Sequence, residues 1–293
     1  MPPIALNVAI VAYRCRELAR ECLASLRAHP PRRSMNVVVV DNDSRDGTIE
    51  MVRDEFPEVD LVEAGRNLGF SAATNIAIGR GSAPYVLALN PDTRMRAGVL
   101  DHLLALMDGR PEIGICGCRL EREDGTPDHA ARRSFPTPLS ALGHFTGLAR
   151  RLPGSHRLAA YTAPTVDEGP VDAVNGAFML IRRAALEQVG LFDEGYWMYM
   201  EDLDLCYRVK QAGWKVWYEP AVTVVHVKAG TSGRHRRFRL NCAFHYGMAR
   251  FYRTHYARSR PAALNAAVYA GIAVKFGVSA VRSAVARHIL RAS

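Results

Sequence analysis

The sequence lacks several short patterns that mark common classes of protein. Its six cysteines are scattered and none forms a CxxC pair, which favours a reduced, cytoplasmic chain over a disulfide scaffold or a zinc module. No GxGxxG follows the first predicted strand and no GxxxxGK[ST] occurs, which argues against a dinucleotide dehydrogenase and a P-loop enzyme. No charged segment precedes the first apolar residues, so no signal peptide is predicted.

The overall composition is that of a globular protein. The 293 residues are 48% hydrophobic and 23% charged, enough for one large or two modest domains with a sizeable core. The formal charge of +9 favours anionic partners: nucleic acid, nucleotide phosphates or an acidic membrane surface. Composition alone does not choose among these three.

Short apolar runs alternate with helical patterns in the first part of the chain. The runs end at polar or turn-forming residues, as buried strands do. This alternation predicts an α/β fold with a doubly wound, mostly parallel sheet and a ligand crevice at the carboxyl ends of the strands. The predicted strands are 7–13, 37–40, 60–63 and 85–89, and the predicted helices are 17–28, one starting at 49, and 71–79 with Ser71 as candidate cap.

Three polar loops follow the second, third and fourth predicted strands. The first, DNDSRDGT from 41 to 48, offers side-chain acceptors for a base and a ribose. The second brings Arg66, whose guanidinium suits a diphosphate. The third brings the oxygens of Asn90 and Asp92, which suit a hard divalent cation such as Mg²⁺ or Mn²⁺. Each loop taken singly is more often an ordinary polar surface loop, but together they favour a nucleotide-diphosphate site.

The segment 197–213, WMYMEDLDLCYRVKQAG, carries the catalytic candidates. Apolar residues at helical spacing begin at Glu201, which places Glu201 and Asp202 at a helix amino terminus. The helix dipole would stabilise both carboxylates there for structural reasons alone. However, an aromatic and methionine collar from 196 to 200 lies just upstream, and apolar surroundings raise a carboxylate pKa, as a general base requires. Asp204 and Arg208 are interpreted as an ion pair on the helix face.

Further candidates lie in the second half of the chain. Asn175 and Gly176 precede an apolar strand at 177–181, at a point where the chain can approach a ligand closely. His226 ends a later strand and is a candidate metal or phosphate ligand, although a lone histidine is more often structural. The arginine-rich run that includes Arg234 and Arg236 either covers a diphosphate or is simply solvated. The segment 130–165 is a long excursion, either a cover for an acceptor or a surface loop.

Three stretches in this order, VVVVDNDSRDGT, GRNLGFSAATN and LALNPDT, resemble the amino-terminal half of family 2 inverting glycosyltransferases with the GT-A fold. The Asn-Pro-Asp form resembles the rhamnosyltransferase-like branch, where it replaces the usual DxD. The resemblance implies a role for each of these residues: Asp41, Asn42 and Asp43 for the nucleoside, Arg66 and Asn67 for base or diphosphate, Asp92 for the metal, Asp202 as the base, and Glu201 for orienting the acceptor. Trp197, in the aromatic collar, is a candidate acceptor or diphosphate contact.

The resemblance implies an inverting, metal-dependent hexosyltransferase of cell-envelope glycan synthesis. It further implies rhamnose from dTDP-rhamnose as the sugar and a lipid-linked or polysaccharide acceptor at the inner face of the cell membrane. Two alternatives remain: a nucleotidyltransferase on sugar phosphates and a noncatalytic, basic nucleic-acid-binding protein. The first lacks a glycine-rich loop with a following basic residue, and the second lacks any recognised motif. No nucleic-acid partner is therefore expected.

The chain is expected to form a glycosyltransferase domain over 1–260 and a helical extension over 261–293. The domain would comprise a nucleotide-sugar half to about 120 and an acceptor half from about 121. The extension has the pattern of a basic amphipathic helix, which predicts peripheral membrane contact. Its apolar run reaches Lys275 too soon for a span of about 20 residues. Packing on the domain or a partner is the alternative, and the oligomeric state, a homodimer included, stays open.

Overall fold

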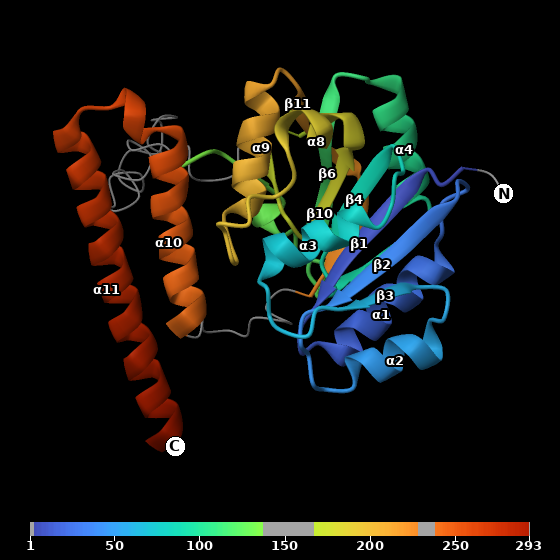
Figure 1. The fold of residues 1–293 in the computed structure, drawn as a ribbon, viewed down its shortest axis with the longest axis horizontal. Coiled ribbons are helices and arrows are strands. Elements are labelled where there is room, and N and C mark those ends of the chain that lie inside the picture. Colours follow the sequence, from blue (N-terminus) through green and yellow to red (C-terminus); the bar gives the residue numbers. More distant parts are fainter. Residues whose placement is uncertain (1–2, 137–166, 228–237, 293) are drawn as a thin grey trace.

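The computed structural model describes residues 3–136, 167–227 and 238–292, with side chains described as far as Ser283 (Figure 1). The strands are β1 (Leu6–Ala12), β2 (Met35–Asp41), β3 (Asp60–Glu63), β4 (Tyr85–Leu89), β5 (Thr93–Arg94), β6 (Ile113–Glu121), β7 (Arg132–Arg133), β8 (Gly169–Pro170), β9 (Ala173–Val174), β10 (Phe178–Arg182) and β11 (Lys215–His226). The helices are α1 (Arg16–Ala28), α2 (Thr48–Glu55), α3 (Phe70–Gly79), α4 (Val99–Gly109), α8 (Arg183–Val189), α9 (Glu201–Gln211), α10 (Phe238–His255) and α11 (Ala262–Ala292), with short 3₁₀ helices at His129–Ala131 and Ala257–Ser259.

The central sheet has the strand order β3-β2-β1-β4-β10-β6-β11-β5, and β8 pairs with β11. Strands β3, β2, β1 and β4 are parallel, as predicted. The next strand, β10, runs antiparallel to both β4 and β6 and so joins the two halves of the chain inside one sheet. Since the buried valines and leucines of β1, β2 and β4 face helices on both sides, the core runs along the whole parallel half.

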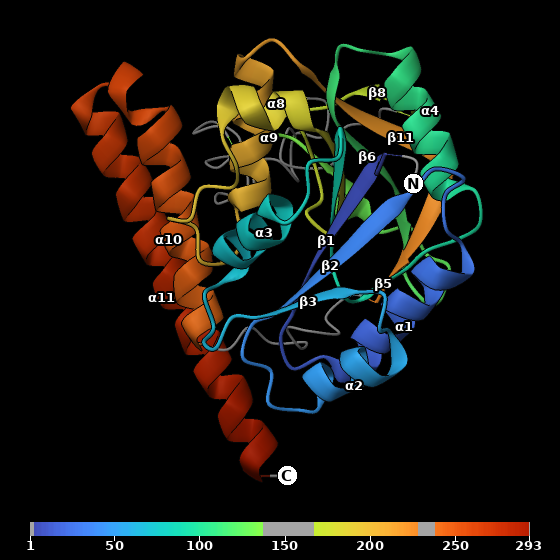
Figure 2. The ribbon, with the colours of Figure 1, turned by 45° about the vertical axis from the view of Figure 1, so that its right-hand side comes forward.

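The direction of the strand crossovers divides the helices between the two faces. From β1 through β2 to β3 the chain moves toward one edge, and it then reverses to reach β4 beside β1. Because right-handed crossovers are the rule, α1 and α2 lie on one face and α3 on the other. Figure 2 shows α1 and α2 next to each other and α3 near α9. The reversal creates the switch point at which such sheets bind ligands.

The predicted elements agree closely with the observed ones in the amino-terminal half. The ranges of β3 and β4 are as predicted, and β1, β2 and α1 differ by one or two residues at their ends. The cap prediction for Ser71 is wrong: Gly69 precedes the helix, and the Ser71 hydroxyl donates instead to the Tyr196 carbonyl (2.7 Å). The cause is a tertiary contact with a segment 125 residues away.

Helices α10 and α11 form an antiparallel hairpin beside α9 (Figure 1). The α10 side chains Phe251 and Tyr252 are buried, and α11 packs on α10 through the Tyr252–Asn265 hydrogen bond (2.7 Å). The sequence predicted that the apolar run of the tail is too short to span a membrane. By length and composition, residues 262–283 of α11 are long and apolar enough for a span, and 6% of this stretch is buried. One such helix is weak evidence for a span.

Candidate active site

The loop after β2 holds the loop after β3. The Asn42 amide donates to the Gly69 carbonyl (3.0 Å), and its oxygen accepts the Leu68 N–H (2.8 Å). Asn67 closes the same loop by accepting the Gly69 N–H (3.0 Å). Both asparagines predicted to bind the nucleotide therefore have structural roles that fix the shape of its candidate pocket.

Asp41 is the candidate nucleoside acceptor in this loop. It ends β2 in a buried position, and one carboxylate oxygen accepts the Ser44 N–H (3.1 Å). Its other oxygen, Oδ1, is buried without a hydrogen-bond partner in the described part of the chain. A buried acceptor left over in this way is costly unless a ligand completes it. The neighbouring Asp43 accepts instead from Arg45 (2.8 Å), and Arg66 lies exposed in the next loop.

The pairing of β5 with β11 brings the Asn-Pro-Asp turn to a histidine far along the chain. Thr93 is paired with His226 in the antiparallel register, and the Val227 N–H donates to the Asp92 carbonyl (2.8 Å). As a result the Nε2 of His226 lies 3.5 Å from an Asp92 carboxylate oxygen, and both side chains are buried. The structure thus brings together the two predicted metal ligands, Asp92 and His226.

A second carboxylate lies on the other side of the same imidazole. The Nδ1 of His226 is 3.3 Å from an Asp128 carboxylate oxygen. Burial alone would lower the His226 pKa, but the hydrogen bonds to Asp128 and Asp92 outweigh it and raise the pKa to about 9. Sequence reasoning missed Asp128, because it lies between a turn and an excursion without any strand-end pattern.

The catalytic segment begins with a constrained turn. Tyr199 and Met200 both have positive φ angles, 71° and 74°, which is uncommon for residues other than glycine. Helix α10 packs directly against this turn, where Gly247 leaves room for the Tyr199 carbonyl and the Met200 side chain. The turn delivers Glu201 and Asp202 to the start of α9, as predicted, and both are buried.

Asp202 is held by donors from two other elements. One carboxylate oxygen accepts the Gly176 N–H (2.9 Å) and is bonded to the Arg133 guanidinium, which also donates to the Val174 carbonyl (3.1 Å). Gly176 therefore touches the catalytic candidate, and a methyl group there would lie 3.2 Å from the same oxygen. Asn175, beside it, caps the turn by accepting the Ala177 N–H (2.9 Å).

The two adjacent carboxylates differ in their electrostatic surroundings. Burial, and next the negative charge of Asp202, raise the pKa of Glu201 to about 8. Glu201 is consequently neutral at pH 7. The Arg133 guanidinium is bonded to the neighbouring carboxylate, Asp202. The raised pKa that the apolar collar predicted is therefore that of Glu201. Asp202, bonded to a cation and to the Gly176 N–H, is the candidate proton acceptor.

The candidate metal loop and the candidate catalytic turn meet at one sheet edge. In the register of β10 with β4, Phe178 lies opposite Leu89, and the Asn90 N–H donates to the Ala177 carbonyl (3.0 Å). The residue before Ala177 is Gly176, whose N–H is bonded to Asp202. Two consecutive residues therefore contact the Asn-Pro-Asp turn and the candidate base, as a single site requires.

Trp197 joins the nucleotide loop to helix α10. The Trp197 carbonyl accepts the Phe70 N–H (2.8 Å), and the Trp197 ring lies so close to Gly69 that any side chain at position 69 would clash with it. From α10, the Arg239 guanidinium lies 4.1 Å from the centroid of the Trp197 ring. A stacked cation of this kind is suited to a phosphate group. Arg234 and Arg236, predicted to contact a diphosphate, lie outside the described residues.

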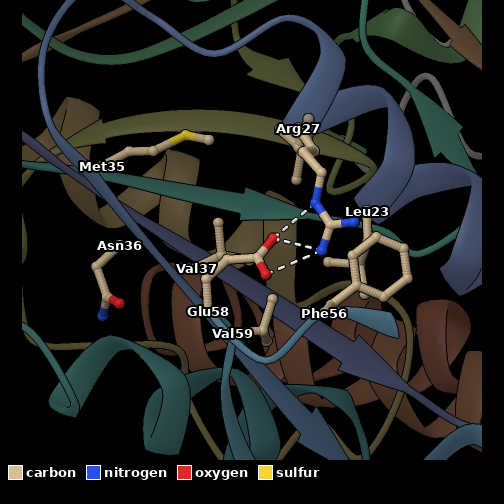
Figure 3. A pocket seen from close by; sticks show the side chains of 9 residues that line it. Leu23, Arg27, Met35, Asn36, Val37, Phe56, Glu58 and Val59 are labelled. Carbon is tan, nitrogen blue, oxygen red and sulfur yellow. Dashed lines mark hydrogen bonds and ion pairs between the residues drawn. The ribbon is translucent and has the colours of Figure 1, made fainter. Parts of the chain in front are cut away.

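A cavity lies near the amino end of β2, away from the carboxyl ends that carry the candidate site. Its volume is about 140 Å³, and it lies between α1, the start of β2 and the end of α2 (Figure 3). The Arg27 guanidinium stacks on the Phe56 ring at 4.3 Å and pairs with Glu58 at 2.7 Å. Because this cavity is near the amino ends of the strands and its charged groups are already paired, it is separate from the candidate active site.

Comparison with known proteins identifies the family. The model described as "Glycosyltransferase like family 2" matches residues 2–242. The chain belongs to this family. As a family 2 glycosyltransferase it is an enzyme of sugar transfer, which disfavours the nucleotidyltransferase and nucleic-acid-binding alternatives.

Its relatives include named rhamnosyltransferases. The glycosyltransferase is 34% identical over 242 residues, 78% of each chain, to N-acetylglucosaminyl-diphospho-decaprenol L-rhamnosyltransferase of Mycobacterium tuberculosis. It is 25% identical over 227 residues to rhamnosyltransferase WbbL of Escherichia coli, covering 75% of this chain and 82% of the relative. These matches confirm the predicted likeness to rhamnosyltransferases.

Solved structures show the same fold. GalNAc-T7 with UDP, GalNAc and Mn²⁺ matches 87% of this chain and 48% of its own, about half its length, at TM-score 0.62 and 16% identity. Mannosyltransferase PcManGT from Pyrobaculum calidifontis, with GDP-Man and Mn²⁺, matches 100% of this chain and 76% of its own at TM-score 0.58 and 17% identity. These identities are low, so the likeness confirms the predicted GT-A fold and nothing finer.

Proposed function

We propose that this glycosyltransferase transfers rhamnose, from dTDP-rhamnose, to a lipid-linked acceptor at the inner face of the cell membrane, with inversion at the anomeric carbon. The relative from Mycobacterium tuberculosis, at 34% identity over most of both chains, supports the sugar and the acceptor class. The observation that carries the chemistry is the pair of contacts made by Ala177 with Asn90 and by Gly176 with Asp202, because they join the candidate metal loop to the candidate base.

In the proposed reaction Asp202 takes the proton of the acceptor hydroxyl. The hydroxyl oxygen attacks the anomeric carbon from the face opposite the diphosphate, and the bond between that carbon and the diphosphate oxygen breaks. The product has the inverted configuration, and no covalent enzyme intermediate forms. Glu201, which is neutral at pH 7, has a proton with which to hydrogen-bond the acceptor.

A divalent cation fits the residues at the Asn-Pro-Asp turn. Asp92 and His226 present a buried carboxylate oxygen and an imidazole nitrogen to each other, a donor set that suits Mn²⁺. Among the described residues no three His, Cys, Asp or Glu side chains form a complete shell, so the diphosphate and water would supply the remaining ligands. The bound cation would neutralise charge on the departing diphosphate.

The proposal is tested by measuring nucleoside diphosphate release from a panel of nucleotide sugars, with and without acceptor. Asp202→Asn should reduce transfer by about 10²-fold or more, the range for loss of a general base, while donor affinity stays near the wild-type value. Glu187→Gln, on the exposed face of α8, is the matched control and should turn over normally. Normal turnover by Asp202→Asn would remove Asp202 from its role.

We also propose that α11 contacts the membrane. Its polar stripe faces α10: Ser279 is hydrogen-bonded to Asn241 (3.0 Å), and Lys275 lies 5.9 Å from the Phe244 ring centroid. A second, apolar stripe, Val274, Val278 and Val281, is 55–68% exposed. A helix that turns its apolar side outward in a basic protein is suited to an acidic lipid surface.

A further inference from the structure

Asp128 is a buried acid that has no assigned role in the reaction. It is 3% exposed and lies just before the 3₁₀ helix His129–Ala131. One carboxylate oxygen, Oδ1, caps that helix by accepting the Ala130 N–H (3.1 Å), and the Asp128 N–H donates to the Leu120 carbonyl at the end of β6 (2.8 Å). Its backbone and its first oxygen are therefore fixed by the fold.

The second carboxylate oxygen of Asp128 faces His226. It lies 3.3 Å from Nδ1, while Nε2, on the other side of the imidazole, lies 3.5 Å from Asp92. The ring thus stands between two carboxylates and presents a different nitrogen to each. Asp128 cannot share a cation with Nε2, because it binds the far side of the ring.

Capping alone does not account for a carboxylate at this position. A cap needs one acceptor oxygen, which asparagine or serine supplies without a charge, whereas burying a carboxylate is costly unless its charge is compensated. The His226 imidazole is one group that faces the second oxygen of this carboxylate. A bound cation displaces the Nε2 proton of the ring, while the carboxylate that accepts the Nδ1–H keeps the ring oriented with the Nε2 lone pair toward the metal.

We propose that Asp128 is a positioning residue for the divalent cation: it accepts the Nδ1–H of His226 and so directs the Nε2 lone pair toward the cation held by Asp92. This inference rests on the proposed function, because it presupposes a cation at Asp92. It assigns Asp128 no contact with the cation itself.

The test is the affinity for Mn²⁺ alone, measured by titration calorimetry or by the electron paramagnetic resonance signal of free Mn²⁺. Asp128→Asn keeps a capping oxygen but turns an amide N–H toward Nδ1, which forces the proton onto Nε2. The expected result is an affinity about 10- to 100-fold lower, the range for loss of such a partner. Asp124→Asn is the matched control, since Asp124 also caps a turn (Thr126 N–H, 2.9 Å) but is exposed, and the affinity of this variant should equal wild type.

A double-mutant cycle separates orientation from simple loss of negative charge. If Asp128 acts through the imidazole, Asp128→Asn should have little further effect in a His226→Ala background. An equal loss in both backgrounds would mean a charge effect, and an unchanged affinity of the single variant would mean a cap only. Either result overturns the inference.

Asp92→Asn distinguishes this inference from the proposed function. If Asp92→Asn binds Mn²⁺ as tightly as wild type, or wild type binds none, the proposed cation site is wrong and the inference falls with it. If Asp92→Asn loses binding while Asp128→Asn retains it, the cation site stands and only the role of Asp128 is rejected.

Discussion

The guanidinium of Arg133 is bonded to the carboxylate of Asp202, 69 residues further along the chain. Arg133 belongs to β7, whose pairing with β9 places it beside the Val174 carbonyl that it also contacts. The bond places a cation beside two adjacent buried carboxylates, Glu201 and Asp202. Without that cation the two carboxylates would lie side by side with less compensating charge.

Replacing Arg133 with glutamine should therefore slow transfer at pH 7. Asp202 would lose both a nearby positive charge and one of the donors that hold its carboxylate, and the expected loss in kcat is roughly 10- to 100-fold. Arg133→Lys keeps the charge and should retain more activity than Arg133→Gln. Unchanged kcat in both variants would show that Arg133 has no role in transfer.

Gly176→Ala should impair catalysis more than folding. The new methyl group would lie 3.2 Å from an Asp202 oxygen and 3.3 Å from its Cβ, so the carboxylate must move by a few tenths of an ångström. Because displaced catalytic groups lose much of their effect, we expect kcat to fall about 10-fold or more with a small change in Tm. Gly109→Ala, at a position with open space, is the control and should leave kcat unchanged.

The raised pKa of Glu201 predicts how stability depends on pH. The pKa is 4.5 in the unfolded chain and about 8 in the folded protein, so the folded state binds the proton more tightly. The resulting stabilisation is fully present below pH 4.5 and is lost as pH rises through 8. Relative to Glu201→Gln, the wild type should lose on the order of 3 kcal/mol between pH 5 and pH 8. Denaturant unfolding at several pH values measures this, and parallel curves would contradict the pKa assignment.

The sequence predicted what local patterns determine. The predicted first and last residues of β3 and β4 are those observed. The turn at Asn90 follows from Pro91, which cannot continue the strand. Helix α9 likewise begins at Glu201 as predicted. These features depend on a few neighbouring residues, so a single sequence contains the necessary information.

Contacts between distant segments were not predictable in the same way. Asp204 was interpreted as a helix-face residue paired with Arg208, and that pair exists, but Asp204 is buried because His255 binds it from α10 (2.7 Å). The Asp128 contact with His226 spans 98 residues and was missed for the same reason. The pattern of apolar residues within one segment does not reveal which side chain of a distant segment will contact it.

The outward-facing valines of α11 give a prediction for the membrane. Replacing Val274, Val278 and Val281 together with serine should weaken binding to anionic vesicles by about 10-fold or more, because each buried aliphatic side chain contributes about 1 kcal/mol or more of transfer free energy. These side chains are already more than half exposed, so folding and transfer to a soluble acceptor should be retained. Leu264→Ser, a single change near the start of α11, is the control and should have a smaller effect. Equal vesicle binding by the triple variant and wild type would reject membrane contact through this face, and a simultaneous change in oligomeric state would assign the face to a second copy of the chain instead.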